Sequence, residues 1–113
     1  MHKHNSLFTL FAAMISCNSL YAADLPVIYS KPDGVTISEG SSSKNMLIHS
    51  DNPKNVLQWQ SFDIGKDNVV EFLGKNSSFL NIVRGNKPTN IQGILSSEWE
   101  VKGIYIVNPN GIN

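Results

Sequence analysis

Side chains suited to acid–base chemistry or metal binding are scattered along this chain. His49 is the one histidine beyond the first few residues, with no cysteine or second histidine near it, which makes it a poor metal ligand or triad member. Two acid pairs, Asp63 with Asp67 and Glu98 with Glu100, offer in principle the paired carboxylates of a glycosidase. Glycine-rich phosphate loops are missing from the sequence. The sequence therefore predicts no catalytic site, no metal and no cofactor.

Charge and composition point to a β-rich domain without a nucleic-acid partner. Nine Lys and Arg balance nine Asp and Glu, whereas nucleic-acid binding needs clustered cations. Charged residues are only 16% of the 113 residues, and asparagine and serine are abundant in their place. Because these two residue types favour turns over helix interiors, we expect one small, turn-rich β domain.

The first residues have the pattern of a secretory signal peptide. A basic start precedes an apolar run over residues 7–15, and small residues follow at positions 22 and 23. We predict a signal peptide at residues 1–22 and a domain at residues 23–113. Cys17 is the only cysteine, and it leaves open a lipoprotein cleavage site as an alternative. Removal of the signal peptide leaves no cysteine for a disulfide or a thiolate metal site.

Short apolar runs with turn residues between them predict an all-β domain. Their centres are roughly ten to thirteen residues apart, and no stretch keeps a helical period over three turns. This spacing is compatible with a β-sandwich, a barrel or a parallel β-helix. The asparagine-rich turns favour the β-helix, in which stacked Asn side chains can form hydrogen-bond ladders. The predicted strands cover residues 35–37, 46–48, 56–64, 69–73, 79–83, 91–95 and 104–107.

Several of these runs alternate between apolar and polar positions, which places one face of each strand in the core. Val70 and Phe72 flank Glu71 in one run, and Leu80 and Ile82 flank Asn81 in another. We expect the apolar pair in each run to face the core.

Several motifs follow one another from Asn55 to Ile112, about two thirds of the predicted domain. Their central residues are Trp59, Phe62, Ile64, Gly65, Leu80, Asn81, Val83 and Gly93, and the last motif is Asn108, Pro109, Asn110, Gly111 and Ile112. With these motifs in this order, the chain resembles the N-terminal secretion domain of the filamentous haemagglutinin family, which is exported by two-partner secretion.

The resemblance implies a right-handed parallel β-helix and a secretion-targeting function. The implied partners are the Sec export machinery and an outer-membrane β-barrel transporter with POTRA domains. The implied location is the cell surface or the medium, reached through the periplasm of a Gram-negative cell. A host-cell or carbohydrate receptor would be bound by a later, adhesin- or haemagglutinin-like part. Family members continue far beyond the last motif, so the resemblance also implies a C-terminally truncated member.

The last motif has the residues of a tight turn, with Asn first, Pro second and Gly fourth. We expect it to end the run at residues 104–107, and two roles remain open: folding alone, or transporter recognition as well. The segment at residues 96–103 is longer than the family pattern. Two other functions also stay open, a stand-alone periplasmic or lipoprotein binding module and a carbohydrate-active β-helix enzyme using acids such as Asp63 or Glu98.

Overall fold

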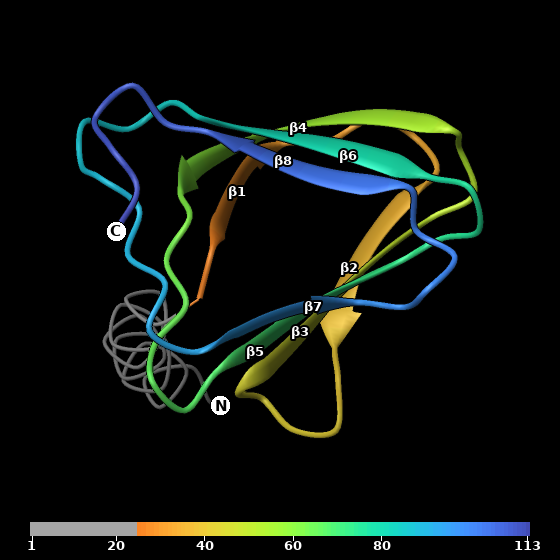
Figure 1. Ribbon diagram of the computed structural model, residues 1–113, viewed down its shortest axis with the longest axis horizontal. Helices are drawn as coiled ribbons and strands as arrows, with labels where there is room; N and C mark the ends of the chain where they lie inside the picture. Colours follow the sequence, from red (N-terminus) through yellow and green to blue (C-terminus); the bar gives the residue numbers. More distant parts are fainter. Residues whose placement is uncertain (1–24) are drawn as a thin grey trace, which may run out of the picture.

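The computed structural model describes residues 25–113, so the predicted signal peptide at residues 1–22 and its boundary with the domain lie outside the described part. The all-β prediction is confirmed, because residues 25–113 contain eight strands and no helix (Figure 1). Within this part, therefore, no helix could span a membrane. The strands are β1 Val27–Ser30, β2 Val35–Glu39, β3 Asn45–Ser50, β4 Lys54–Ser61, β5 Val69–Leu73, β6 Ser78–Val83, β7 Ile94–Ser97 and β8 Gly103–Val107.

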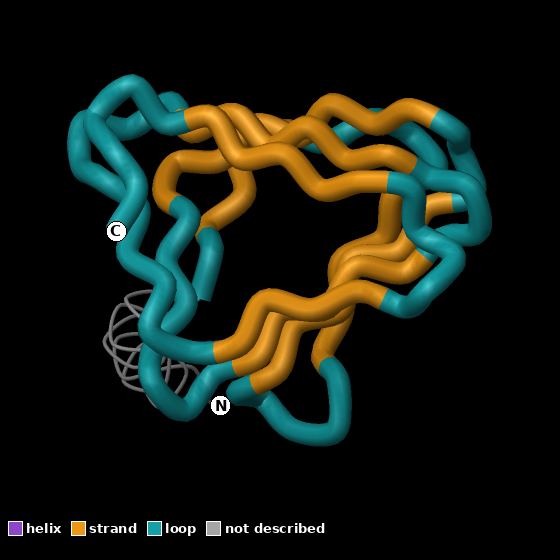
Figure 2. The backbone as a smooth tube through the Cα atoms, in the orientation of Figure 1, coloured by secondary structure: helices purple, strands orange, loops and turns teal. Residues whose placement is uncertain are grey.

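The strands form two four-stranded sheets that face each other. One sheet has the order β1-β4-β6-β8 and the other the order β2-β3-β5-β7, and Figure 2 shows the two groups of strands with loops between them. From β3 onward the chain alternates between the two sheets. Strands β4 and β6 pair in parallel, as do β6 and β8, so that Val56 lies beside Leu80 and Leu80 beside Tyr105. Each pass thus returns to the same sheet 24 or 25 residues later, directly beside the previous one.

Loops join the two sheets on both sides. On one side, residues 62–68, 84–93 and 108–113 lie on one another through two parallel bridges, Ile64 with Ile91 and Thr89 with Ile112. We call this the motif side; it is at the left of Figure 1, beside the C-terminus. On the corner side, residues 51–53, 74–77 and 98–102 connect the strands. We call β7, β8 and residues 108–113 the C-terminal rung.

Most of the predicted strands form, with three corrections. Strand β1 was not predicted, because its apolar stretch is short and precedes the turn residues Lys31 and Pro32. The predicted run at 91–95 is wrong in its first part, since β7 begins only at Ile94. Gly93 turns the chain there, so close to the backbone of Gly65 that a Cβ would collide with its oxygen. The run at 56–64 likewise ends early, because β4 stops at Ser61.

The inward face of β6 is the reverse of the prediction. Phe79, Asn81 and Val83 are buried, whereas Leu80 and Ile82 lie on the outer face and are only partly covered. Burial of the phenylalanine ring sets this register, and Asn81 then needs a polar partner inside. The prediction for β5 is correct, with Val70 and Phe72 buried. The buried apolar core comprises Val35, Ile48, Leu57, Trp59, Phe62, Ile64, Val70, Phe72, Phe79 and Val83.

Candidate functional site

The last sequence motif forms a tight turn directly after β8. The Gly111 N–H donates to Asn108 O at 3.0 Å, which closes the turn. The Asn110 N–H donates to Asn108 Oδ1 at 2.9 Å, so the Asn108 side chain braces the turn from within. Gly111 has a φ of +110°, a value that favours glycine. The turn predicted from the sequence is therefore present, and it ends β8 at Val107.

Side-chain amides of the motif attach the turn to the preceding loop. Asn108 is 9% exposed, and its Nδ2 donates to Lys87 O and to Thr89 Oγ1, both at 3.0 Å. Asn110 Nδ2 donates to Gly85 O at 2.9 Å and to Asn108 Oδ1 at 3.1 Å. Both side chains thus bind parts of this chain about twenty residues earlier.

Backbone hydrogen bonds continue the attachment across the motif side. Thr89 N donates to Gly111 O at 3.0 Å, and Asn113 N donates to Thr89 O at 2.8 Å. One layer further, Ile64 N donates to Asn90 O at 3.0 Å, and Gln92 N to Ile64 O at 2.9 Å. The structure therefore brings the last motif, Gly93, Ile64 and Gly65 onto one side of the molecule.

Most of the remaining motif residues lie in the interior between the sheets. The rings of Trp59 and Phe62 meet edge to face, with centroids 5.2 Å apart. Trp59 Nε1 donates to Asn81 Oδ1 at 2.9 Å, and Asn81 Nδ2 donates to Tyr105 O at 3.1 Å. This chain of contacts runs through β4, β6 and β8, so one aromatic residue and one amide connect three successive passes of the same sheet. Of the central motif residues, Leu80 lies apart on the outer face of that sheet.

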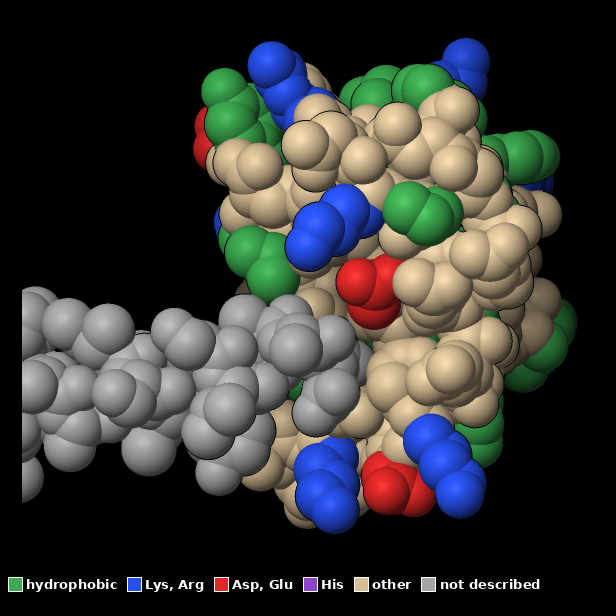
Figure 3. Space-filling model, turned by 90° about the vertical axis from the view of Figure 1, so that its left-hand side faces the viewer, with side chains coloured by type: hydrophobic (Ala, Val, Ile, Leu, Met, Phe, Trp, Pro, Cys, Tyr) green, Lys and Arg blue, Asp and Glu red, His purple; other side chains and the backbone are tan. Residues whose placement is uncertain are grey.

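The surface of the motif side is neither strongly charged nor strongly apolar. Figure 3, in which this side faces the viewer, shows mainly backbone and uncharged polar side chains, with separate basic, acidic and apolar groups between them. Part of this side is hollowed, because residues 65–68 and Gln92, together with Leu25, Ser43 and Lys44, line a cavity of about 430 Å³.

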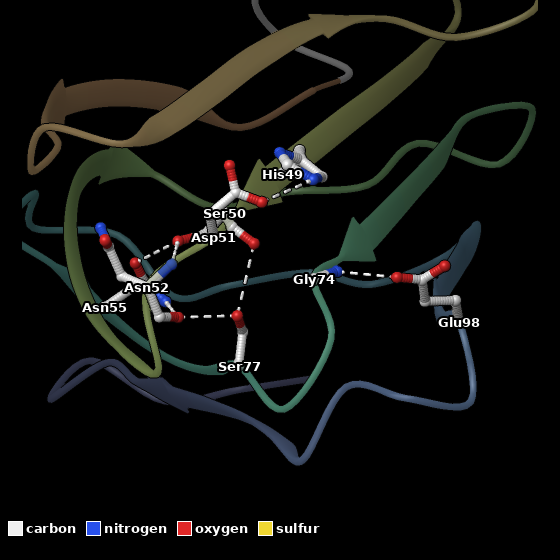
Figure 4. A network of polar contacts seen from close by, with 8 residues as sticks. All are labelled: His49, Ser50, Asp51, Asn52, Asn55, Gly74, Ser77 and Glu98. Atoms are coloured by element: carbon white, nitrogen blue, oxygen red, sulfur yellow. Dashed lines mark hydrogen bonds and ion pairs between the residues drawn. The ribbon is translucent and has the colours of Figure 1, made fainter.

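Sequence reasoning missed several buried polar residues that hold the loops. Thr89 is fully buried, as are Ser50 and Ser77. Ser50 Oγ donates to Asn55 Oδ1 at 2.6 Å, and Ser77 Oγ donates to Asn52 O at 2.7 Å, in the network of Figure 4. The one available signal is that each serine lies two residues from the end of a predicted strand, at residues 46–48 or 79–83.

Two of the four acids singled out in the sequence accept hydrogen bonds within the fold. Asp63 Oδ1 accepts a hydrogen bond from Asn90 N at 2.8 Å, and Glu98 Oε1 accepts one from Gly74 N at 2.9 Å (Figure 4). His49 is exposed on the outer face of β3, and its Nε2 lies 3.6 Å from a carboxylate oxygen of Asp51. Within residues 25–113, no three His, Cys, Asp or Glu side chains gather as a metal site would require.

Comparisons with known proteins give related sequences and related structures. No family model matches the chain. Two heme/hemopexin-binding proteins of Haemophilus influenzae are similar in sequence, one 35% identical over 96 residues and the other 30% identical over 116 residues. These matches cover 80% and 99% of this chain but only 10% and 12% of the two relatives, so the chain spans about a tenth of their length.

Among the related structures is the crystal structure of the HMW1 secretion domain from Haemophilus influenzae. It aligns with a TM-score of 0.58 and 26% sequence identity. The alignment covers 75% of this chain and 23% of that one.

Proposed function

We propose that this chain, which belongs to the secretion domains of two-partner secretion, directs the export of a larger exoprotein through an outer-membrane transporter. The resemblance predicted from the sequence is confirmed by the similarity to the HMW1 secretion domain. The observation that carries the proposal is the C-terminal rung, in which the last motif closes a turn and attaches to the rung before it. A domain built from repeated parallel passes can fold one pass at a time as it emerges from a pore.

The finer fold that we propose is the N-terminal part of a right-handed parallel β-helix. Two features support it: the regular return of the chain after 24 or 25 residues and the loops that lie on one another at the motif side. The outer edges of β7 and β8 would then receive the next coil in parallel register. In the same proposal, residues 23–113 form the secretion domain.

Export would proceed in two steps. The predicted signal peptide at residues 1–22 directs the chain to the Sec machinery and into the periplasm. There, the POTRA domains of a β-barrel transporter bind the chain while it is extended. Addition of an extended segment to an exposed sheet edge suits this step, because main-chain hydrogen bonds provide affinity without a fixed sequence.

Folding outside the cell would drive the transport. If folding contributes ~0.1 kcal/mol per residue, one pass of 24 residues contributes ~2 kcal/mol, which disfavours backsliding by about thirtyfold. Asn108, Pro109, Asn110, Gly111 and Ile112 would act in this step by closing the rung, in addition to any contact with the transporter. The central motif residues, Trp59 and Asn81 above all, would act by joining successive passes.

The exported protein would act at the cell surface or in the medium. We propose an adhesin- or haemagglutinin-like exoprotein, in which residues 25–113 have a targeting role and not a catalytic one. Binding to a host-cell or carbohydrate receptor, or to the heme or hemopexin named for the two relatives, would belong to parts of the protein beyond this domain. The use of Asp63 and Glu98 as acceptors for backbone N–H groups supports the non-catalytic proposal.

The test is secretion of a passenger fused to the full chain, with and without the cognate transporter. We expect transporter-dependent passage into the medium, reduced when Asn108 and Asn110 are both replaced by alanine. Replacement of Asn86, an exposed asparagine of the same loop stack, by alanine is the matched control and should leave export unchanged. Export that is independent of the transporter would refute the targeting function. Equal export of the Asn108/Asn110 variant would refute the role of the motif.

A further inference from the structure

Asn110 and Gly111 are the one Asn–Gly pair of the sequence, and this pair has a chemistry of its own. In an extended chain, the Gly111 backbone nitrogen can attack the side-chain carbonyl carbon of Asn110, because glycine has no Cβ to restrict the approach. A C–N bond forms, and the Asn110 side-chain nitrogen leaves as ammonia, taking up the proton of the Gly111 N–H. Water then opens the cyclic imide to aspartate or isoaspartate, so an amide is replaced by a carboxylate.

The folded C-terminal rung engages both nitrogen atoms of this reaction. The Gly111 N–H, which must attack, donates to Asn108 O at 3.0 Å. Asn110 Nδ2, which must leave, donates to Gly85 O at 2.9 Å and to Asn108 Oδ1 at 3.1 Å. Reaction therefore requires that three hydrogen bonds break and that the turn open, although the Asn110 side chain itself is exposed to water.

The neighbouring asparagine of the motif cannot react in this way. Asn108 precedes Pro109, and proline has no N–H to attack with. Asn86 precedes Lys87 and Asn76 precedes Ser77, whose side chains hinder the ring closure that glycine permits. The chemistry thus singles out Asn110 within the motif.

We propose that Asn110 is a latent deamidation site, which folding of the C-terminal rung keeps unreactive. The product carboxylate has no proton to donate, so its oxygen would face Gly85 O and Asn108 Oδ1 in repulsion. A chain that stays extended too long would lose the turn that closes its C-terminal rung. This consequence for export rests on the proposed function, whereas the protection of Asn110 by folding does not.

The test compares the full chain with a synthetic peptide of residues 103–113 in mildly alkaline buffer. Trypsin cleavage after Lys102 releases the same residues from the full chain, so mass spectrometry measures Asn110 deamidation in both samples. We expect the folded chain to react at least about tenfold more slowly than the peptide, since reaction needs local opening of the rung. Urea should remove the difference. Equal rates in the folded chain and the peptide would overturn the proposal, as would reaction of Asn86 as fast as Asn110 in the urea-unfolded chain.

A matched pair of variants at Thr89 tests the protection by the rung without changing the reacting residues. Thr89→Val removes the hydroxyl that accepts from Asn108 Nδ2, whereas Thr89→Ser keeps a hydroxyl. We expect faster deamidation of Asn110 in the valine variant, including the case in which that variant unfolds, and a nearly unchanged rate in the serine variant. An unchanged rate in a destabilised Thr89→Val chain would contradict the protective role of the rung.

A secretion assay with Asn110→Asp separates this inference from the proposed function. Normal export of that variant would refute a role for Asn110 in export and would leave the deamidation chemistry intact.

Discussion

The two ends of the strand stack are built on different pairings. At one end, β1 and β2 run antiparallel to β4 and β3. At the other end, β8 and β7 run parallel to β6 and β5. A parallel strand repeats the direction and register of the strand beneath it, whereas an antiparallel strand reverses the direction. The stack therefore has a polarity: the β1–β2 end interrupts the repeat, and the β7–β8 end continues it.

The two ends also differ in the contacts that hold them. Strand β1 shows two register shifts along β4, and the Arg84 guanidinium lies over the Tyr29 ring at 4.4 Å. The C-terminal rung follows a regular ladder, and buried amide contacts of Asn108 reinforce it. The comparison teaches that antiparallel strands, one of them irregular in register, close one end, whereas repeated parallel pairing and asparagine contacts build the other.

Replacing the buried tryptophan that joins successive passes should destabilise the whole stack and have the largest effect. We expect Trp59→Ala to lower the free energy of unfolding by about 3–5 kcal/mol, because it removes a fully buried ring and the hydrogen bond to Asn81. Urea unfolding followed by circular dichroism measures the loss. Trp99, 90% exposed, provides the control, and Trp99→Ala should change the value by less than about 0.5 kcal/mol. Similar losses in both variants would argue against the central role of Trp59.

A methyl group at Gly93 should weaken the C-terminal rung selectively. In Gly93→Ala, the new Cβ would collide with the backbone oxygens of Gly65 and Asn68, and we expect a loss of about 1–3 kcal/mol. Hydrogen exchange should accelerate in β7 and residues 108–113 more than in β2 and β3. Gln92→Ala, a change at the exposed neighbouring position, is the control. Uniform acceleration over the whole chain would show that the two ends are not separable.

Loss of the buried amide should weaken the C-terminal rung to a similar extent, through lost hydrogen bonds. Asn108→Ala leaves Lys87 O and the Thr89 hydroxyl without their donor, which should cost about 1–3 kcal/mol. The urea midpoint measures this effect, with Asn86→Ala as the matched exposed control. A stability equal to that of the control would mean that the backbone ladder alone holds the turn.

The smallest effect is expected at the β1–β2 end. Tyr29→Leu retains an apolar side chain but removes the ring beneath Arg84, and we expect a loss of about 0.5–1 kcal/mol. Hydrogen exchange should increase in β1 and leave the C-terminal rung unchanged. An effect larger than that of Asn108→Ala would reverse the proposed order of the two ends.

Local chemistry made part of this structure predictable. In six of the seven predicted runs, a strand covers most of the run. These strands were predictable because the spacing of apolar and turn residues depends on near neighbours alone. The turn at Asn108 was predictable for the same reason. The prediction of a strand from Ile91 is wrong, because the close approach of the Gly93 and Gly65 backbones decides where β7 begins.

The sequence by itself thus determined the all-β class, the turn after β8 and the family resemblance. Only the tertiary structure decided that Asn81 faces the core while Leu80 faces outward. It also decided that the Thr89 hydroxyl accepts a hydrogen bond from the Asn108 side chain. The reason is that these choices depend on partners about twenty residues away. The register of a strand follows the best total burial of large rings such as Phe79, and a buried amide is tolerated only where another pass of the chain supplies its hydrogen bonds.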